Sequence, residues 1–259
     1  MERLAGGFIN DCYHRDTVVV KEYQSDKLCG QEGSRRRERE RMSLNKFGNG
    51  HGIAPTLIEM TPNTLLQEFL HGDVLENVQK TEEDLFYTGK LLRNIHTPVS
   101  RAFNITRSDY EGKFKRHVSK AIFILNEEGI NPHIDINWNK VEESGTTRIH
   151  RDYWLGNVMR TRDANKLPSQ RYKAIDWEFA GIGSPYEDFS IAHMWIFRVY
   201  GGEDFFWEGY GSTPDKDTIR EFLKLKTVEF ISRCGYNDYM NESKDGFYHK
   251  KTQILRGLI

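Results

Sequence analysis

The chain has 259 residues, of which 37% are hydrophobic and 12% aromatic, which is enough apolar material for one large domain or for two lobes that share an interface. Lysine and arginine together number 37 against 38 acidic residues, and the net charge of -1 gives no reason to expect a nucleic-acid partner. The three cysteines are widely spaced, which argues against a disulfide framework or a zinc site. No apolar run approaches the ~20 residues of a membrane span. We therefore expect a cytoplasmic protein without a membrane partner.

The first 70 residues are predicted to form a small β-rich lobe with one helix. Short β-branched and apolar runs between glycine and proline turns predict strands, and the spacing of Met42, Leu44 and Phe47 predicts the helix. The predicted elements are, in chain order, a strand over 17–23, a helix over about 32–47, and strands over 54–60 and 64–70.

After residue 71 the pattern becomes mainly helical. Thr81 is a typical N-cap with Asp84 three residues further on, and this pair begins the best-defined helix. We therefore predict an N-terminal lobe over 1–70 and a C-terminal lobe over 71–259. The predicted elements of the second lobe are helices over 81–96, about 108–129 and about 215–235, and short strands over 147–149 and 172–175.

The strongest chemical signal is the run from His150 to Asn157. Its His-Arg-Asp sequence, with an asparagine five residues after the aspartate, matches the catalytic-loop pattern of kinases. In that pattern the aspartate accepts the proton of an incoming hydroxyl, and the asparagine turns its amide oxygen back toward a magnesium ion on the phosphates. The sequence therefore predicts Asp152 as the catalytic base and Asn157 as a magnesium ligand.

A second signal is Asp176, which ends a predicted strand 19 residues after Asn157. Magnesium prefers oxygen ligands and is usually held by one or two carboxylates together with substrate phosphates. We therefore predict that Asn157 and Asp176 bind Mg²⁺ together.

These motifs, followed by the run from Gly181 to Phe189, resemble the aminoglycoside phosphotransferase and choline kinase superfamily, and weaker similarity extends over most of the chain. The resemblance implies an α+β, two-lobed, protein-kinase-like fold. It also implies an enzyme that transfers the γ-phosphate of magnesium-bound ATP, with GTP as an alternative donor, to a hydroxyl group of a small molecule.

The resemblance assigns further nucleotide-binding roles. Lys21 would steady the α- and β-phosphates, with Glu40 as its ion-pair partner and Glu38 and Glu32 as open alternatives. The remaining assignments are a phosphate-covering loop with Gly7 and Asn10, and an adenine-binding hinge at Gln67 and Phe69.

Departures from the protein-kinase pattern favour a small-molecule acceptor. The chain has no G-x-G-x-x-G loop and no Ala-Pro-Glu element, and Trp154 stands where protein kinases usually carry a lysine. A protein kinase and a catalytically inactive nucleotide-binding module are the two alternatives. The second is disfavoured because Lys21, Asp152, Asn157 and Asp176 are all present.

The acceptor is left open between an aminoglycoside, an amino alcohol such as choline, and a sugar-like metabolite, and the oligomeric state is not predicted. The segment 194–210 is rich in aromatic and acidic residues, which suits either core packing or a pocket wall for a cationic acceptor. Three other residues near the motifs have structural interpretations: His150 bonds the loop backbone, Asp188 anchors the loop, and Glu178 is either an acid behind the metal site or a salt-bridge partner.

Overall fold

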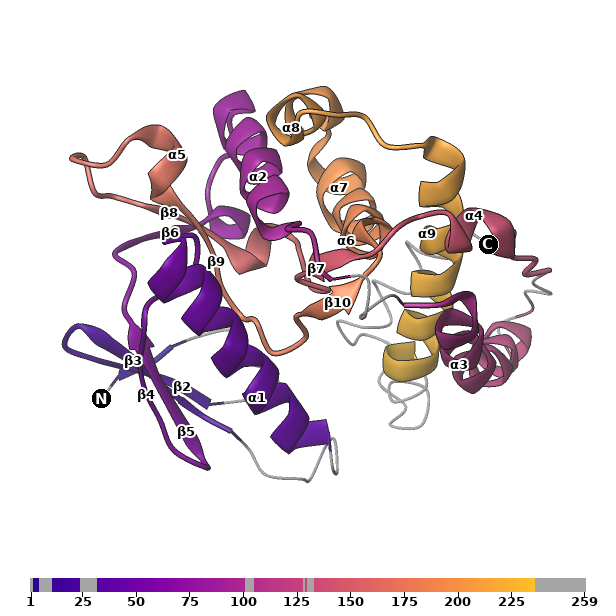
Figure 1. The fold of residues 1–259 in the computed structure, drawn as a ribbon, viewed down its shortest axis with the longest axis horizontal. Helices are drawn as coiled ribbons and strands as arrows, with labels where there is room; N and C mark the ends of the chain where they lie inside the picture. The colour runs from indigo at the N-terminus through magenta and orange to yellow at the C-terminus, as the bar shows by residue number, and fades with distance from the viewer. Residues whose placement is uncertain are drawn as a thin grey trace. The chain divides into compact units, whose positions relative to one another are not determined.

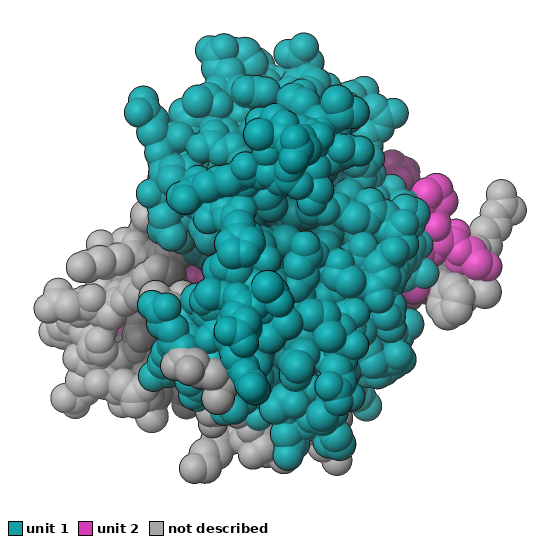
Figure 2. All heavy atoms as spheres, turned by 90° about the vertical axis from the view of Figure 1, so that its left-hand side faces the viewer, with its two compact units in different colours: residues 1–97, 148–181, 200–213 teal, residues 98–147, 182–199, 214–259 magenta. Residues whose placement is uncertain are grey.

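A computed structural model describes residues 2–4, 11–23, 32–100, 105–127, 129 and 133–235. The chain divides into two compact units that interleave along the sequence, and Figure 2 colours them separately. Unit 1 comprises residues 1–97, 148–181 and 200–213, and unit 2 comprises residues 98–147, 182–199 and 214–259. The predicted lobe boundary near residue 70 is a different division, and it stays a prediction.

Unit 1 contains a five-stranded antiparallel sheet (Figure 1). Lys21 lies opposite Cys12 on one neighbouring strand and opposite Leu65 on the other, so its position is fixed from both sides. The strands predicted over 17–23, 54–60 and 64–70 are confirmed. In spatial order the strands are β1 (Glu2–Arg3), β2 (Asp11–Arg15), β3 (Val18–Glu22), β5 (Thr64–Glu68) and β4 (Leu57–Met60).

The predicted helix over about 32–47 is confirmed as α1 (Glu32–Ser43), which continues as the π-helical turn η1 (Leu44–Gly50). Leu44 and Phe47 are buried, whereas Met42 is 55% exposed, so two of the three apolar positions used in the prediction face the core. The helix lies beside the sheet (Figure 1), and Glu40 of α1 contacts Lys21 of β3.

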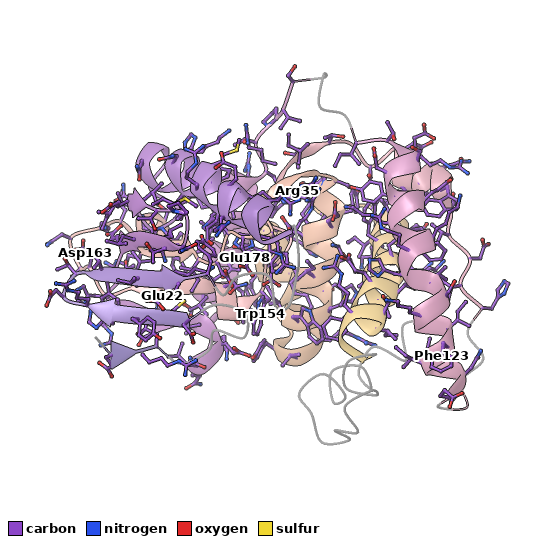
Figure 3. The ribbon with its side chains drawn as sticks, turned by 90° about the horizontal axis from the view of Figure 1, so that it is seen from below. Glu22, Arg35, Phe123, Trp154, Asp163 and Glu178 are labelled. Atoms are coloured by element: carbon purple, nitrogen blue, oxygen red, sulfur yellow. The ribbon has the colours of Figure 1, made fainter. Side chains whose placement is uncertain are left out.

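A second antiparallel sheet of unit 1 has the order β6, β8, β9, formed by Gly72–Val74, Val158–Thr161 and Tyr172–Ala174. The predicted strand over 172–175 is thus confirmed, while β6 was not predicted from the sequence. Between β8 and β9 the chain forms a projecting loop with Asp163 near its tip (Figure 3). The short helices of this region are η2 (Leu75–Asn77), η4 (Leu155–Asn157) and α5 (Pro168–Arg171).

Helices α2 (Glu82–Ile95) and α8 (Glu203–Tyr210) pack against each other in unit 1. Thr81 and Asp84 form the predicted capping box of α2. The two backbones approach closely at Gly89 and Gly209, where a Cβ atom would lie only 2.0 Å from the carbonyl oxygen of Phe206 and 1.8 Å from that of Phe86. Only glycine fits at these two positions, because any side chain would push the helices apart.

Unit 2 is helical. One buried cluster consists of Tyr110, Ile136, Val141 and Phe222. A second cluster joins α3 (Arg107–Glu127) to α9 (Lys216–Phe230) and η6 (Ile231–Gly235) through Ile124, Leu125, Val228 and Ile231. The helices predicted near 108–129 and 215–235 are confirmed, although the second ends at residue 230 and continues as a π-helical turn. The helices are α3 (Arg107–Glu127), α4 (Trp138–Glu142), α6 (Pro185–Ala192), η5 (His193–Phe197), α9 (Lys216–Phe230) and η6 (Ile231–Gly235).

Three short elements lie where the chain passes from one unit to the other: β7 (Thr147–Ile149), β10 (Gly181–Gly183) and α7 (Arg198–Tyr200). The strand predicted over 147–149 is therefore confirmed. Helices and strands together give the mixed α+β content that the sequence predicted. Among the helices that the structure describes, none is both long and apolar enough to span a membrane.

Candidate active site

Lys21 is the centre of a buried charge cluster in unit 1. Its ammonium nitrogen lies 3.0 Å from both carboxylate oxygens of Glu40, 2.8 Å from Oδ1 of Asp176 and 3.7 Å from Oε2 of Glu178. Glu38, one of the open alternatives, instead pairs with Arg41 on the exposed face of α1. The structure therefore brings together three residues singled out in the sequence, Lys21, Glu40 and Asp176, although they come from a strand, a helix and a loop.

The charges in this cluster stabilise one another. Burial opposes ionisation of Lys21, but the nearby carboxylates of Asp176 and Glu40 outweigh it and raise the pKa of the lysine well above its usual value. Burial likewise opposes ionisation of Asp176, whose pKa is nevertheless lowered by Lys21. Glu178 differs: its burial, together with the charges of Asp176 and Glu40, raises its pKa to about 7 against the effect of Lys21.

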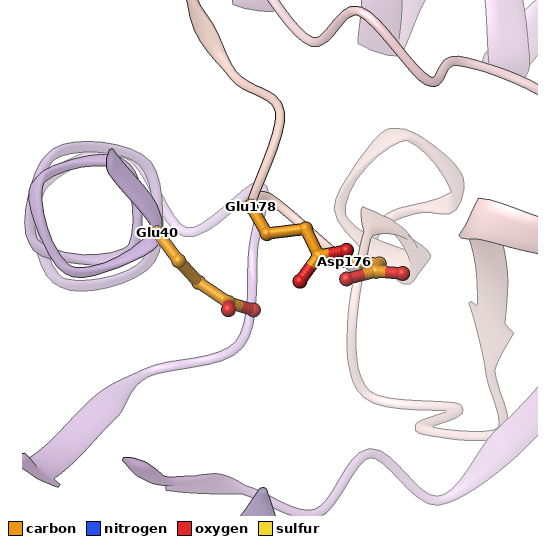
Figure 4. A group of neighbouring side chains, drawn as sticks. All are labelled: Glu40, Asp176 and Glu178. Atoms are coloured by element: carbon orange, nitrogen blue, oxygen red, sulfur yellow. The ribbon is translucent and has the colours of Figure 1, made fainter. Parts of the chain in front are cut away.

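The three carboxylates form a group suited to a divalent cation. Oxygen atoms of Glu40, Asp176 and Glu178 lie within 4.8 Å of one another, and their side chains converge from α1 and from the segment after β9 (Figure 4). Glu40 and Glu178 are almost fully buried, whereas the side chain of Asp176 is 40% exposed. Because the ammonium of Lys21 already bonds Glu40, the exposed carboxylate of Asp176 is the member of this group that could bind magnesium, which prefers oxygen and keeps several positions for water and phosphate.

Asp152 and Asn157 are held together by the fold of the catalytic loop. The side-chain nitrogen Nδ2 of Asn157 donates to the backbone carbonyl and to Oδ2 of Asp152, both at 2.8 Å. With its nitrogen engaged in this way, Asn157 has its amide oxygen as the atom that can bind a cation. The backbone carbonyl of Asn157 accepts from the amide of Ile175, which places the loop directly beside Asp176.

His150 and Trp177 support this arrangement from within the core. The Nε2–H of His150 donates to the carbonyl of Ile175 at 3.0 Å, so the histidine bonds backbone as expected, but at the residue that precedes Asp176. Trp177 is fully buried, stacks on Phe47 with ring centroids 4.8 Å apart, and donates to the carbonyl of Ala174. Both side chains fix the segment that carries Asp176.

Two residues of the site have a backbone conformation that side-chain-bearing residues rarely adopt. Arg151 has φ of 66° and Asp176 has φ of 59°. Such left-handed conformations cost of order 1–3 kcal/mol and persist only where the surroundings impose them. The turns at Arg151 and Asp176 thus set the direction of the chain beside Asp152 and at the exposed carboxylate of Asp176.

The predicted adenine-binding hinge lies at the end of β5. Gln67 pairs with Val19 of β3, and the ring of Phe69 stacks on His14 with centroids 3.8 Å apart. The backbone amide of Phe69 already donates to Thr17, so a bound base would meet other atoms of this segment. The phosphate-loop residues Gly7 and Asn10 lie outside the described residues.

Sequence reasoning missed two members of the cluster. The hydroxyl of Tyr23 donates to Glu40 at 2.7 Å, and Arg36 of α1 lies 3.9 Å from Glu178 with its guanidinium over the ring of Phe179. The helical spacing of Arg36 and Glu40, one turn apart, was the only available signal for Arg36.

The aromatic and acidic segment 194–210 divides between the two units. Trp207 is only 5% exposed and its indole nitrogen donates to Glu203, which favours the packing interpretation for this residue. The end of α8 nevertheless borders an open hollow of about 420 Å³, lined by Asp204, Trp207, Glu208, Gly211, Ser212 and Thr213. Asp188 is fully buried in the first turn of α6, and its anchoring role stays a prediction.

Comparisons with known proteins show the family of the chain. The model of the phosphotransferase enzyme family matches residues 1–222. None of the curated proteins with which the chain was compared matches it in sequence.

Solved structures of low identity share its fold. A choline/ethanolamine kinase family protein from Mesorhizobium loti is 13% identical, with a TM-score of 0.64 over 99% of this chain and 85% of that one. The choline kinase LicA from Streptococcus pneumoniae is 16% identical, with a TM-score of 0.64 over 99% and 92%. The streptomycin–ATP–APH(2'')-IIa ternary complex is 14% identical, with a TM-score of 0.58 over 98% and 90%. These similarities confirm the predicted protein-kinase-like α+β fold. The match of the family model to residues 1–222 confirms the resemblance predicted from the sequence, and the chain belongs to the phosphotransferase enzyme family.

Proposed function

We propose that this protein transfers the γ-phosphate of magnesium-bound ATP to a hydroxyl group of a small molecule. The observation that carries the proposal is the convergence of Lys21, Glu40 and Asp176 beside the loop that joins Asp152 to Asn157. Phosphoryl transfer requires little covalent help from the protein, so positioning and charge stabilisation by such a cluster are its main needs.

Each residue has one task in this proposal. Asp152 accepts the proton of the acceptor hydroxyl, and Lys21, held at Glu40, provides the positive charge that orients the phosphates. Asn157 and Asp176 are the residues that would hold Mg²⁺, with Glu178 close behind, and the bound ion would neutralise charge on the phosphates. The left-handed turn at Asp176 aims its carboxylate to the exposed side of the cluster.

The comparisons support a nucleotide donor and a small acceptor. One similar structure contains ATP together with streptomycin, and another is a choline kinase. The absence of protein-kinase sequence elements, noted above, speaks against a protein substrate.

A cationic acceptor is the finer part of the proposal. The hollow at the end of α8 carries two carboxylates, Asp204 and Glu208, and carboxylates attract cations. The acceptor KM should then rise with ionic strength, because salt screens such attraction. Asp204→Asn with Glu208→Gln should raise the acceptor KM, while Glu83→Gln, at an exposed acid of α2, should leave it unchanged.

An acceptor screen tests the proposal. The wild-type protein is incubated with magnesium-ATP and, in turn, amino alcohols, aminoglycosides and neutral sugars, and ADP formation is measured. We expect acceptor-dependent ADP formation with one class, strongest for amino alcohols or aminoglycosides. A protein that binds magnesium-ATP but forms ADP with none of these acceptors would contradict the acceptor assignment, and one that binds no nucleotide would contradict the function as a whole.

A further inference from the structure

Arg36 and Glu40 lie one helical turn apart on α1, and both are buried. Residues with this spacing share a helix face. Glu40 holds Lys21, whereas Arg36 lies 3.9 Å from Oε1 of Glu178. A buried arginine on the face of a helix that meets the nucleotide cluster is costly to desolvate, so it calls for a partner that offsets the cost.

The partner of Arg36 is the segment that follows Asp176. The guanidinium carbon of Arg36 lies 4.5 Å from the ring centroid of Phe179, and its Nη1 faces the carboxylate of Glu178. The planar guanidinium can stack on a ring and face a carboxylate at once, which an ammonium group does poorly. Together with the stack of Phe47 on Trp177, the α1–η1 helix thus contacts this segment at two places.

Glu178 lies between two cations. Its Oε1 faces Arg36, and its Oε2 is 3.7 Å from the ammonium nitrogen of Lys21. The same nitrogen is nearer to Asp176, at 2.8 Å, and to Glu40, at 3.0 Å. Without Arg36, Lys21 would be the nearest remaining cation for Glu178 among the residues that the structure describes, and Coulomb attraction at this range in a buried site is strong.

We propose that Arg36 is a positioning residue of the nucleotide site. It balances the negative charge of Glu178 on the side opposite to Lys21, so that the ammonium of Lys21 stays bonded to Glu40 and Asp176. This inference rests on the proposed function, since it assumes that Lys21 faces the phosphates. It adds that Arg36 acts through Glu178 and without touching the nucleotide.

The test measures magnesium-ATP binding by calorimetry and thermal melting for Arg36→Met, alone and combined with Glu178→Gln, at a pH well above the pKa of about 7 of Glu178, so that this carboxylate is ionised. Arg36→Met removes the charge and keeps much of the apolar stem. We expect it to weaken magnesium-ATP binding about 5- to 30-fold, the range that one or two kcal/mol produces. In the Glu178→Gln background the same change should alter affinity by less than about twofold, because the charge that would attract Lys21 is gone.

Two controls separate positioning from folding. Arg41→Met removes an exposed arginine of the same helix, paired only with Glu38 among the contacts described, and should leave affinity unchanged. Arg36→Lys keeps the charge and should lose less affinity than Arg36→Met. If Arg36→Met does not fold, Arg36→Lys is tested in its place. It should weaken magnesium-ATP binding by a smaller factor, and this loss of affinity should again disappear in the Glu178→Gln background.

The outcomes are distinct. Equal losses of affinity in the wild-type and Glu178→Gln backgrounds, or wild-type affinity in Arg36→Met, would overturn the role of Arg36. In either case, weakened binding by Asp176→Ala in the same assay would leave the proposed function standing. A wild-type protein that does not bind magnesium-ATP would overturn both.

Discussion

Asp84 and Asp176 are two acidic residues of the same unit with opposite surroundings. Asp84 is fully buried, and its carboxylate accepts from Arg160 at 2.8 and 3.0 Å, from Tyr172 at 2.8 Å, and from the backbone and hydroxyl of Thr81 at 2.9 and 2.8 Å. One carboxylate thus has one guanidinium and three neutral hydrogen-bond donors. Its charge is satisfied within the protein.

Asp176 lies in a cluster where carboxylates outnumber cations. Glu40, Asp176 and Glu178 face Lys21 and, on one side only, Arg36. The side chain of Asp176 is also open to solvent, whereas that of Asp84 is not. The two acids therefore differ in charge balance and in exposure, and both differences support the proposal that Asp176, rather than Asp84, binds a cation from outside the protein.

The largest expected effect separates chemistry from binding. Asp152→Asn removes the proposed base while keeping an amide that still fits the loop. Turnover of the true acceptor should fall on the order of 10²-fold or more, with magnesium-ATP affinity within a few-fold of wild type. Steady-state kinetics and calorimetry check both numbers, and a variant that retains most of its kcat would show that Asp152 is not the base.

A second prediction concerns Asp84, whose charge is satisfied within the protein. Asp84→Ala leaves Arg160 and Tyr172 without their buried partner and removes the capping box of α2, so we expect a loss of about 3 kcal/mol of unfolding free energy. The kcat/KM of the folded fraction should stay within about twofold of wild type.

Urea unfolding and kinetics below the melting transition measure the two quantities. Asp84→Asn, which keeps an acceptor oxygen, should be less destabilised than Asp84→Ala. Loss of activity without loss of stability in either variant would mean that Asp84, like Asp176, serves the chemistry.

How far the sequence predicts the site depends on the distance of each contact along the chain. Asp152, Asn157 and Asp176 belong to local motifs whose spacing carries their chemistry, and the capping role of Asp84 follows from Thr81 in the same way. The helices and most strands follow from periodicity. The structure places all three motif residues within one unit.

Most contacts between distant segments could not be predicted from the sequence. The family resemblance did suggest Glu40 as the partner of Lys21, with Glu38 and Glu32 as alternatives, and the direction of the helix face confirms Glu40 and leaves Glu38 to Arg41. Arg36 meets Glu178 across the fold, and Tyr172 meets Asp84 in the same manner. No local pattern reports such pairs, because they depend on how the helix and the two sheets pack.

The smallest predicted effect uses Cys12 as a reporter of the cluster. Cys12 lies opposite Lys21 on β2, and burial, together with the charges of Asp176 and Glu40, raises the pKa of its thiol to about 11 against the effect of Lys21. Only the thiolate reacts, so alkylation should keep accelerating up to about pH 11. At pH 8 it should be about 100-fold slower than for a thiol with its ordinary pKa of 9.0.

The measurement is iodoacetamide labelling followed by mass spectrometry, in a Cys29→Ser and Cys234→Ser background. Asp176→Asn should lower the pH at which Cys12 reacts, whereas Asp84→Asn should not. A labelling rate that levels off near pH 9 would contradict the description of Cys12 as a buried thiol beside net negative charge.

The most direct test of the account is the magnesium dependence of nucleotide binding in Asp176→Ala and Asp84→Ala, measured by calorimetry with and without Mg²⁺. We predict that Asp176→Ala weakens magnesium-ATP binding at least about tenfold more than it weakens metal-free ATP binding, because it removes a cation ligand. Asp84→Ala should change both affinities equally and only slightly. Equal losses of ATP affinity with and without Mg²⁺ in Asp176→Ala would contradict the claim that the cluster around Asp176, and not the one around Asp84, binds the magnesium-bound nucleotide.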